Sequence, residues 1–217
     1  MNSSWQRRRR LPLAAALLDV ALACSTVHVH SSGATVIGRT MELGGPGNKV
    51  AFGGLQLGGD PDPGIPWEVV VHRRGEPFGE DMAAVCGVRA APWAAKFGFL
   101  SVDATGPTSV GGKATITVDG LNQAGLTVSA HTLRQSVYMQ PNQDLPNATH
   151  VCFADLTAWL LGNIDSVSKL RDLLPRLHIL AAQVPVPSGQ LLHWTVDDTN
   201  EEHVVIEVRE RNQNLST

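Results

Sequence analysis

The order of the residue patterns along this chain limits its fold more than any other feature. Period-two alternation, typical of strands, recurs between residues 24 and 130. Helical spacing takes over in residues 151–174, and strand-like alternation returns in residues 191–208. The chain contains 21 Gly and 13 Pro, which is near a sixth of its residues. The usual share of these two residues is roughly 12%, so the composition favours a fold rich in turns. Strands, two helices and again strands predict an α+β fold with segregated helices.

The strand-rich part begins with a hairpin. Residues 24–42 alternate on either side of the turn signal Ser31–Gly33. Two loops rich in Gly and Pro follow, at Gly44–Gly47 and Gly58–Gly64. Further strands are expected at residues 67–72, 97–102, 114–118 and 125–130, with Asp119-Gly120 and Asn122–Gly125 as turns that punctuate the last two.

Two helices are predicted next. The apolar segment Val151–Leu161 is expected to be helical with Thr149 as its N-cap, and Asp165 is expected to cap a second helix, Ser166–Leu174. The apolar positions at helical spacing in the second helix are Val167, Leu170 and Leu174.

A second hairpin closes the chain. After the Pro-containing break Val184–Ser188, strands are expected at residues 191–196 and 204–208, around the turn Asp197–Glu201. No internal repeat is evident. We therefore expect residues 24–217 to form one domain.

Charge and composition exclude some partners. The formal net charge of −3 argues against binding to a phosphate backbone, and 5% aromatic residues with a single Tyr argue against base stacking. No apolar run reaches the roughly 20 residues that a membrane-spanning helix needs. Assembly into a homo-oligomer is left open.

The first 23 residues predict a secretory signal peptide. A basic cluster, Arg7–Arg10, precedes a short apolar stretch that ends in Ala21-Leu-Ala23. Asp19 interrupts the apolar stretch, and a disordered basic tail with a short helix is the alternative. Cleavage after Ala23 would remove four Arg and one Asp, leave a net charge of −6 and make Cys24 the first residue. The protein is then expected to be exported, to the periplasm or the exterior.

A lipoprotein signal also ends just before a cysteine. Such a signal prefers Leu three residues before the cysteine and a small residue two before it. Here Ala21 and Leu22 stand in the reverse order. Lipidation of Cys24 is therefore the weaker prediction.

An N-terminal cysteine carries a nucleophile and a base in one residue. A cysteine thiol has a reference pKa near 8.5 and a free α-amine one near 7.7–8.0. The neutral amine accepts the thiol proton, the thiolate attacks a carbonyl, and the ammonium returns the proton to the departing amine. The bland alternatives for Cys24 are a small buried residue at a strand start or one half of a disulfide.

The surrounding motifs resemble a known family. Cys24–Glu42 resembles the opening of the choloylglycine hydrolase family, which contains penicillin V acylases and bile salt hydrolases of the N-terminal-nucleophile superfamily. Val118–Leu126 is similar to the family's Asp-Gly-x-Asn-x-x-Gly-Leu segment. Leu192–Trp194 and Val204–Glu207 look like its later hairpin. The resemblance spans nearly all of residues 24–210.

The resemblance implies a four-layer αββα sandwich and a catalytic role for three residues. Cys24 would be the nucleophile with its own α-amine as base. Arg39 would lie beside the thiol and favour the thiolate. Glu42 stands where the family usually has Asp and would hold the amine, one methylene farther away. The alternative is a surface Arg and a solvated Glu at the end of an ordinary hairpin.

The family also places an Asn or Tyr after the Gly-Leu strand to bind the oxyanion. By counting from Gly125, this position falls on Thr132, beside His131, and we take both as the substrate and oxyanion residues. Family members continue into a Thr-Asn-Ser-Pro segment and a later Arg. This sequence stops at Thr217 without either, so the sandwich is expected to be incomplete at the C-terminus.

Other histidines, cysteines and asparagines in the sequence give weaker indications of function. His28 and His30 share a strand face, but no third ligand is visible, so neither a metal nor a cofactor is expected. Cys86 and Cys152 could pair in an exported protein. Asn147 and Asn214 begin glycosylation sequons that matter only in a eukaryotic secretory pathway.

The leading hypothesis is a hydrolase for linear non-peptide amides. The resemblance suggests a small-molecule N-acyl amide as substrate, such as penicillin V, a conjugated bile acid or a fatty-acyl amide, without choosing among them. The alternatives are a catalytically inactive exported protein of the same fold and, third, a lipid-anchored binding protein.

Overall fold

The computed structural model describes residues 24–31, 34–40, 50–52, 55–57, 67–80, 82–87, 91–107, 113–133, 136–138, 148–182 and 192–209. The elements are, in chain order, β1 (Thr26–Ser31), β2 (Ala34–Arg39), β3 (Val50–Phe52), β4 (Leu55–Leu57), β5 (Glu68–His72), β6 (Pro77–Phe78), α1 (Met82–Cys86), β7 (Trp93–Ala94), β8 (Phe99–Pro107), β9 (Lys113–Asn122), β10 (Thr127–Thr132), β11 (Thr149–Cys152), α2 (Leu156–Asn163), α3 (Val167–Leu173), a 3-10 turn (Leu174–Arg176), β12 (Leu177–Leu180), β13 (Leu192–Asp197) and β14 (His203–Ile206).

A six-stranded antiparallel sheet is the centre of the fold. Its strand order is β14-β13-β10-β9-β8-β5, so most neighbours in space are also neighbours in sequence. There are two exceptions: β5 pairs with β8 across β6, α1 and β7, and β13 returns after both helices to pair with β10 along its whole length. This return brings residues of the last hairpin next to residues of the sheet centre.

One face of the sheet carries the main core. Along β13, buried Leu192, Trp194 and Val196 alternate with half-buried residues, as a strand with one core face should. Helix α2 packs against this face, and the Trp194 indole Nε1–H donates to Thr157 Oγ1 of α2 at 3.1 Å. Almost all of α2 is buried, so the helix fills the layer rather than lying on its surface.

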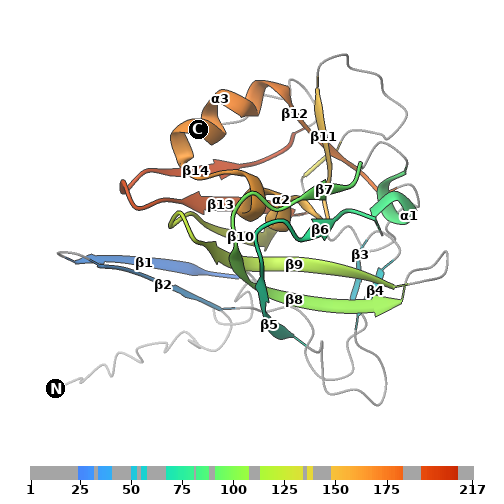
Figure 1. Cartoon of the computed structure of the whole chain (residues 1–217), viewed down its shortest axis with the longest axis horizontal. Helices are drawn as coiled ribbons and strands as arrows, with labels where there is room; N and C mark the ends of the chain where they lie inside the picture. The colour runs from blue at the N-terminus through green and yellow to red at the C-terminus, as the bar shows by residue number, and fades with distance from the viewer. Residues whose placement is uncertain are drawn as a thin grey trace, which may run out of the picture.

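The β1–β2 hairpin lies on the other face of the sheet (Figure 1). Among the described residues, the hairpin is a separate two-stranded sheet with no backbone pairing to the six-stranded sheet. Side chains make the connection instead: Thr26 contacts His131 of β10, and His28 contacts Asp197 of β13. The described layers are therefore helices, a sheet and a hairpin.

The rest of that face exposes apolar side chains. Val69 and Val71 of β5 are 76% and 71% exposed, and Leu100 and Leu121 on the neighbouring strands are 44% and 45% exposed. A contiguous apolar surface of this kind usually meets another element or another molecule. The hairpin covers only the β10 and β13 side of the face.

Both hairpins predicted from the sequence are confirmed, at β1–β2 and β13–β14. The strands expected near β5, β8, β9 and β10 are confirmed as well, and the turn Asn122–Gly125 is present, with Gly125 at φ 87°. The expected loops at 44–47 and 58–64, and the break at 184–188, lie outside the described residues.

The turn expected at Asp119-Gly120 is wrong. Strand β9 runs through both residues to Asn122, and the pairing with β8 shifts at a bulge between Val102 and Asp103. Gly120 is required by close packing: a Cβ there would lie 2.4 Å from Leu161 Cδ1 and 2.5 Å from Leu100 O. Here glycine marks a helix approaching the sheet, which sequence alone does not separate from a turn.

The helix expected from Val151 begins five residues later. Thr149–Cys152 is strand β11, which pairs in parallel with β12, and Thr149 is not a helix cap. In the next helix, Ser166 and not Asp165 is the N-cap, because its Oγ accepts from the Lys169 N–H.

A disulfide joins Cys86 of α1 to Cys152 of β11. It ties the short helix to the β11–β12 pair, across 66 residues of sequence. The pairing left open by the sequence is therefore present. Cys24 is the remaining cysteine, and its thiol is free.

Candidate active site

Cys24 lies two residues before the start of β1 and is half-buried. Two backbone-directed bonds extend the hairpin by one more residue pair: Ser25 N donates to Thr40 Oγ1 at 3.0 Å, and Thr40 N donates to Ser25 O at 2.9 Å. These bonds fix the segment that carries Cys24. Glu42, the third predicted catalytic residue, lies outside the described residues.

The side chain of His131 connects Cys24 to the sheet. Its Nε2 lies 3.1 Å from Thr26 Oγ1 of β1 and 3.2 Å from Thr195 Oγ1 of β13. Thr26 follows Cys24 by two residues, so the contact lies close to the candidate nucleophile, and the Cys24 backbone also acts on the pKa of the His131 ring. One buried side chain thus contacts the candidate nucleophile segment and two strands.

His131 is neutral at physiological pH. Burial lowers its pKa to about 4, and the positive charge of Arg39 together with the neighbouring His193 and His28 contributes in the same direction. The Cys24 backbone acts in the opposite direction but does not overcome them. A neutral imidazole offers one donor and one acceptor.

Arg39 places a nearly buried cation in the same region. Its guanidinium Nη1 donates to Val118 O of β9 at 2.5 Å, and Nη2 donates to Ala130 O of β10. Nη1 also lies 3.5 Å from Asp119 Oδ2, and the Arg39 side chain is only 5% exposed. The Arg39 Nε has no hydrogen-bond partner among the described residues.

Arg39 occupies the point at which two strands separate. Strands β9 and β10 pair only from Thr127↔Leu121 to Ser129↔Asp119 and then diverge. The Arg39 guanidinium supplies donors to the carbonyl groups beyond the last pair, while Ser129 Oγ donates to Asp119 Oδ1 at 2.9 Å. The sequence predicted Arg39 as a site residue but gave no sign of these partners.

Thr132 lies on the opposite face from His131. Successive side chains of a strand alternate, and Thr132 pairs with Leu192, whose side chain belongs to the buried helix-facing row. Of the two residues predicted to bind the oxyanion, His131 is the one on the hairpin face.

Several residues of this region were missed by the sequence analysis. His193 stacks on His131, with ring centroids 5.2 Å apart. His28 was named only as one of two histidines on a strand face, and its Nδ1 lies 3.3 Å from Asp197 Oδ1. Thr26, Thr195 and Asp119 were missed as well. The available signal was the polar alternate positions 193, 195 and 197 of β13, which a half-buried strand uses for its outer face.

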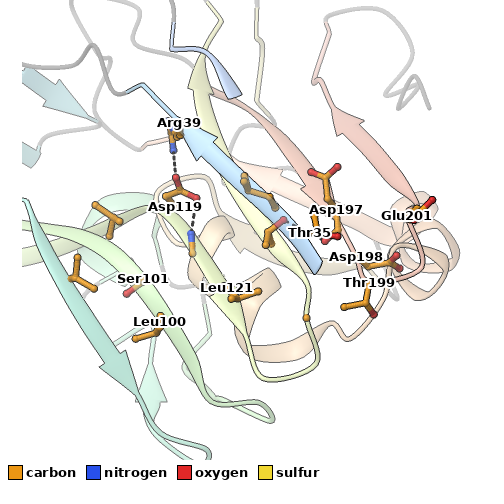
Figure 2. Close-up of a pocket in the computed structure, with 16 residues that line it drawn as sticks. Thr35, Arg39, Leu100, Ser101, Asp119, Leu121, Asp197, Asp198, Thr199 and Glu201 are labelled. Carbon is orange, nitrogen blue, oxygen red and sulfur yellow. Dashed lines mark hydrogen bonds and ion pairs between the residues drawn. The ribbon is translucent and has the colours of Figure 1, made fainter. Parts of the chain in front are cut away.

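A groove of about 860 Å³ runs beside the hairpin (Figure 2). Strand β2 borders it from Thr35 to Arg39, and Leu100 and Leu121 form part of the sheet side. Residues of the β13–β14 turn, Asp197–Glu201, close one end. Arg39 therefore lies between the groove and the region of Cys24 and His131.

Sequence comparison decides the family. The model of the linear amide C-N hydrolases, choloylglycine hydrolase family, matches residues 95–216, which is more than half of the chain. The chain belongs to the choloylglycine hydrolase family. The family match begins at residue 95, so it includes His131 and Thr132 but not Cys24, Arg39 or Glu42. No curated protein sequence is significantly similar to this member of the family.

Solved structures of choloylglycine hydrolase family proteins have a similar fold. A variant of conjugated bile acid hydrolase from Clostridium perfringens is 16% identical with a TM-score of 0.59, over 87% of this chain and 48% of that one. A second variant of the same hydrolase is 19% identical with a TM-score of 0.51, over 66% and 40%. Penicillin V acylase from Agrobacterium tumefaciens is 20% identical with a TM-score of 0.47, over 66% and 38%. This chain thus spans less than half the length of these proteins.

The fold of this choloylglycine hydrolase family member is that of an N-terminal-nucleophile hydrolase, as predicted. The described layers are consistent with an incomplete αββα sandwich, in which the β1–β2 hairpin occupies the side of the second sheet. No helix in the described ranges is long and apolar enough to cross a membrane. The described side chains also contain no group of three or more potential metal ligands.

Proposed function

We propose that this protein hydrolyses linear non-peptide amides with Cys24 as an N-terminal nucleophile. The observation that carries the proposal is the place of Cys24: it lies two residues before Thr26, which contacts His131 and pairs with Arg39, the buried cation of the same region. Membership of the linear amide C-N hydrolases supports the reaction class.

The first half of the reaction breaks the amide bond. The α-amine of Cys24 takes the thiol proton, directly or through a water, and the thiolate attacks the amide carbonyl carbon. When the carbon–nitrogen bond breaks, the ammonium returns the proton to the leaving amine. The product is an acyl group bound to the Cys24 sulfur as a thioester.

The second half regenerates the thiol. Water attacks the thioester carbonyl and gives one proton to the α-amine, which passes it to the departing sulfur. The acyl group leaves as a carboxylic acid. The net reaction is an amide and a water converted to an acid and an amine, with Cys24 unchanged.

Three further residues complete the proposal. Arg39 favours the thiolate through its fixed positive charge, and Glu42 holds the α-amine. Of the two residues predicted for the oxyanion side, we retain His131 as a residue of the site and not Thr132, because the alternation of β10 puts Thr132 on the helix-facing side.

The substrate class is an N-acyl amide, of which penicillin V and conjugated bile acids are examples. The names of the two similar hydrolases support this class, since they act on conjugated bile acids and on penicillin V. We further propose cleavage of a signal peptide before Cys24 and export. The Cys86–Cys152 disulfide supports export, because such bonds persist in oxidising compartments.

The test is a matched set of proteins beginning at Cys24, prepared by secretion or by proteolytic removal of residues 1–23. N-terminal sequencing and intact mass establish a free Cys24 before any assay. We expect penicillin V or a conjugated bile acid to be hydrolysed by this form and not by Cys24→Ala or by the full chain, whose Cys24 nitrogen is an amide.

Two outcomes contradict the proposal. Equal rates for the Cys24 form and Cys24→Ala would mean that the cysteine is not the nucleophile. The alternative of a catalytically inactive protein of the same fold would then be favoured. An acyl-modified Cys24 in the secreted protein would instead indicate a lipid-anchored protein.

A further inference from the structure

Three strands meet at one ring in this protein. His131 belongs to β10, and its Nε2 is within hydrogen-bond distance of a hydroxyl from β1 and a hydroxyl from β13. The β1 hydroxyl belongs to Thr26, two residues after Cys24. These contacts join residues 26, 131 and 195, which no sequence spacing connects.

The contacts to the two threonine hydroxyls engage one nitrogen of the ring. A neutral imidazole has a single N–H donor and a single acceptor nitrogen. Nε2 lies 3.1 Å from Thr26 Oγ1 and 3.2 Å from Thr195 Oγ1. With both hydroxyls against it, Nε2 is not free to donate to an oxyanion.

We propose that His131 is a positioning residue that holds Cys24 against the sheet, rather than an oxyanion donor. It acts through Thr26, two residues after Cys24, so that the thiol is presented from one fixed segment. The effect on hydrolysis rests on the proposed function. The holding of Cys24 does not, and it is measurable in a protein that hydrolyses nothing.

Burial and the charged groups around His131 keep its ring neutral, which is the form that the positioning role requires. Arg39 of β2, His28 of β1, His193 of β13 and the carboxyl groups of Asp119 and Asp197 surround the region. Burial and the Arg39 charge lower the pKa of His131, so the ring stays neutral except in acid. A second cation beside Arg39 would be unfavourable, and protonation would therefore loosen the contact.

The chain itself provides a clean probe. It has three cysteines, and Cys86 and Cys152 form a disulfide, so iodoacetamide under non-reducing conditions labels Cys24 alone. We would measure the labelling rate of the full chain at pH 7.5 by mass spectrometry. The variants are His131→Leu, which removes both ring nitrogens, and His131→Gln, whose amide can replace Nε2. His203→Leu is the control, because His203 is exposed on β14.

We expect His131→Leu to raise the Cys24 labelling rate by about fivefold or more, because the held segment is released. His131→Gln should restore most of the wild-type rate, and His203→Leu should leave it unchanged. A rate within twofold of wild type for a folded His131→Leu would overturn the proposal. Circular dichroism and the thermal midpoint establish folding.

If His131→Leu does not fold, Thr26→Val replaces it. This substitution removes the β1 hydroxyl that contacts the ring and keeps the shape of the side chain. A faster labelling rate then supports the proposal, and an unchanged rate overturns it. In an active preparation, the folded variant of these two should lower kcat and leave KM unchanged, and His131→Gln should keep most of the wild-type kcat. Absence of hydrolysis in the wild type would end the proposed function, while the labelling result would still decide the role of His131.

Discussion

The guanidinium group of Arg39 on β2 donates a hydrogen bond to the carbonyl oxygen of Ala130 on β10, at the place where β9 and β10 separate. With its second bond to Val118 O, it replaces interstrand bonds that the diverging backbones cannot make. The same side chain therefore supports the sheet and supplies the charge of the candidate active site. Structural and catalytic effects of its loss need separate measurements.

Replacing Arg39 should destabilise the protein. Arg39→Met leaves two carbonyl groups without their side-chain donors and leaves Asp119 without its cation, so we expect a loss of about 3–5 kcal/mol in the free energy of unfolding. Urea unfolding measures this loss. Arg209→Met is the control: Arg209 pairs with Glu207 at the surface, and its loss should change the stability by less than about 0.5 kcal/mol. Similar losses in both variants would contradict the assignment of Arg39 as a sheet-bridging residue.

Asn122 should be among the most sensitive polar positions. Its Nδ2 donates to Leu161 O at 2.9 Å and Ile164 O at 2.7 Å, and its Oδ1 accepts from the backbone N–H groups of Ala124 and Leu126 at 3.0 Å each. We expect Asn122→Ala to lower the free energy of unfolding by roughly 3 kcal/mol, because buried carbonyl groups lose their donors.

Asn122→Asp tests the direction of these bonds. The carboxylate keeps the acceptor but presents negative charge to the two helix carbonyl groups, so it should be at least as destabilising as Asn122→Ala. Asn163→Ala, which removes one bond to Trp159 O, serves as the control with an expected loss of about 1 kcal/mol or less. A stable Asn122→Asp protein would show that the donors are dispensable.

The carboxyl group of Asp155 should make stability fall toward neutral pH. Burial raises its pKa to about 7, although the hydrogen bond from Trp93 Nε1, at 2.6 Å, favours the carboxylate. Between about pH 4 and pH 7, the unfolded chain has released this proton and the folded protein has not. The free energy of unfolding therefore declines with rising pH over this range, by at most about 1.4 kcal/mol per unit.

Asp155→Asn removes this dependence. The amide oxygen can still accept from Trp93, and no charge is buried. We expect the variant to be more stable than wild type at pH 7, by about 1–3 kcal/mol, and close to it at pH 4. Urea unfolding of both proteins at three pH values gives the difference. Parallel curves would show that Asp155 ionises freely in the folded protein.

His72 should have the opposite pH dependence to His131. Burial lowers its pKa, but hydrogen bonds to Asp103 at 3.1 Å and Glu76 at 2.9 Å outweigh burial and raise the pKa above 6.5. Its stabilisation is complete below about pH 6.5 and is lost as pH rises through the folded pKa. The destabilisation caused by His72→Gln should therefore be larger at pH 5.5 than at pH 9. Equal losses at both pH values would mean that His72 stays neutral.

The sequence predicted the elements whose patterns are local. Alternation alone located β1, β2, β13 and β14, since each strand has one buried and one open face. The segment after Thr149 gave no such contrast: Val151–Leu161 is apolar throughout, and only pairing with the distant Leu177–Leu180 makes its start a strand. The prediction at Gly120 was wrong for a similar reason, because its neighbour Leu161 is remote in sequence.

In the candidate site, too, some residues could be predicted from the sequence, whereas their partners depend on strands that are distant in sequence. Resemblance to a family was enough to single out Cys24, Arg39 and His131 by their positions in the sequence. The partners of these residues could not be predicted, because Val118, Ala130 and Thr195 come from strands that only the folded sheet brings beside the hairpin. Whether Glu42 holds the α-amine stays a prediction.

In the described part of the chain, β1 and β2 touch the six-stranded sheet through side chains alone. Opening of the arm formed by β1 and β2 would break these side-chain contacts, including those of the buried Arg39, but no backbone pairing of the six-stranded sheet. It should therefore cost less than unfolding of the sheet itself. In amide hydrogen exchange, the arm should lose its protection early and β9, β10 and β13 late, so that access to the thiol and global unfolding are governed by two different free energies.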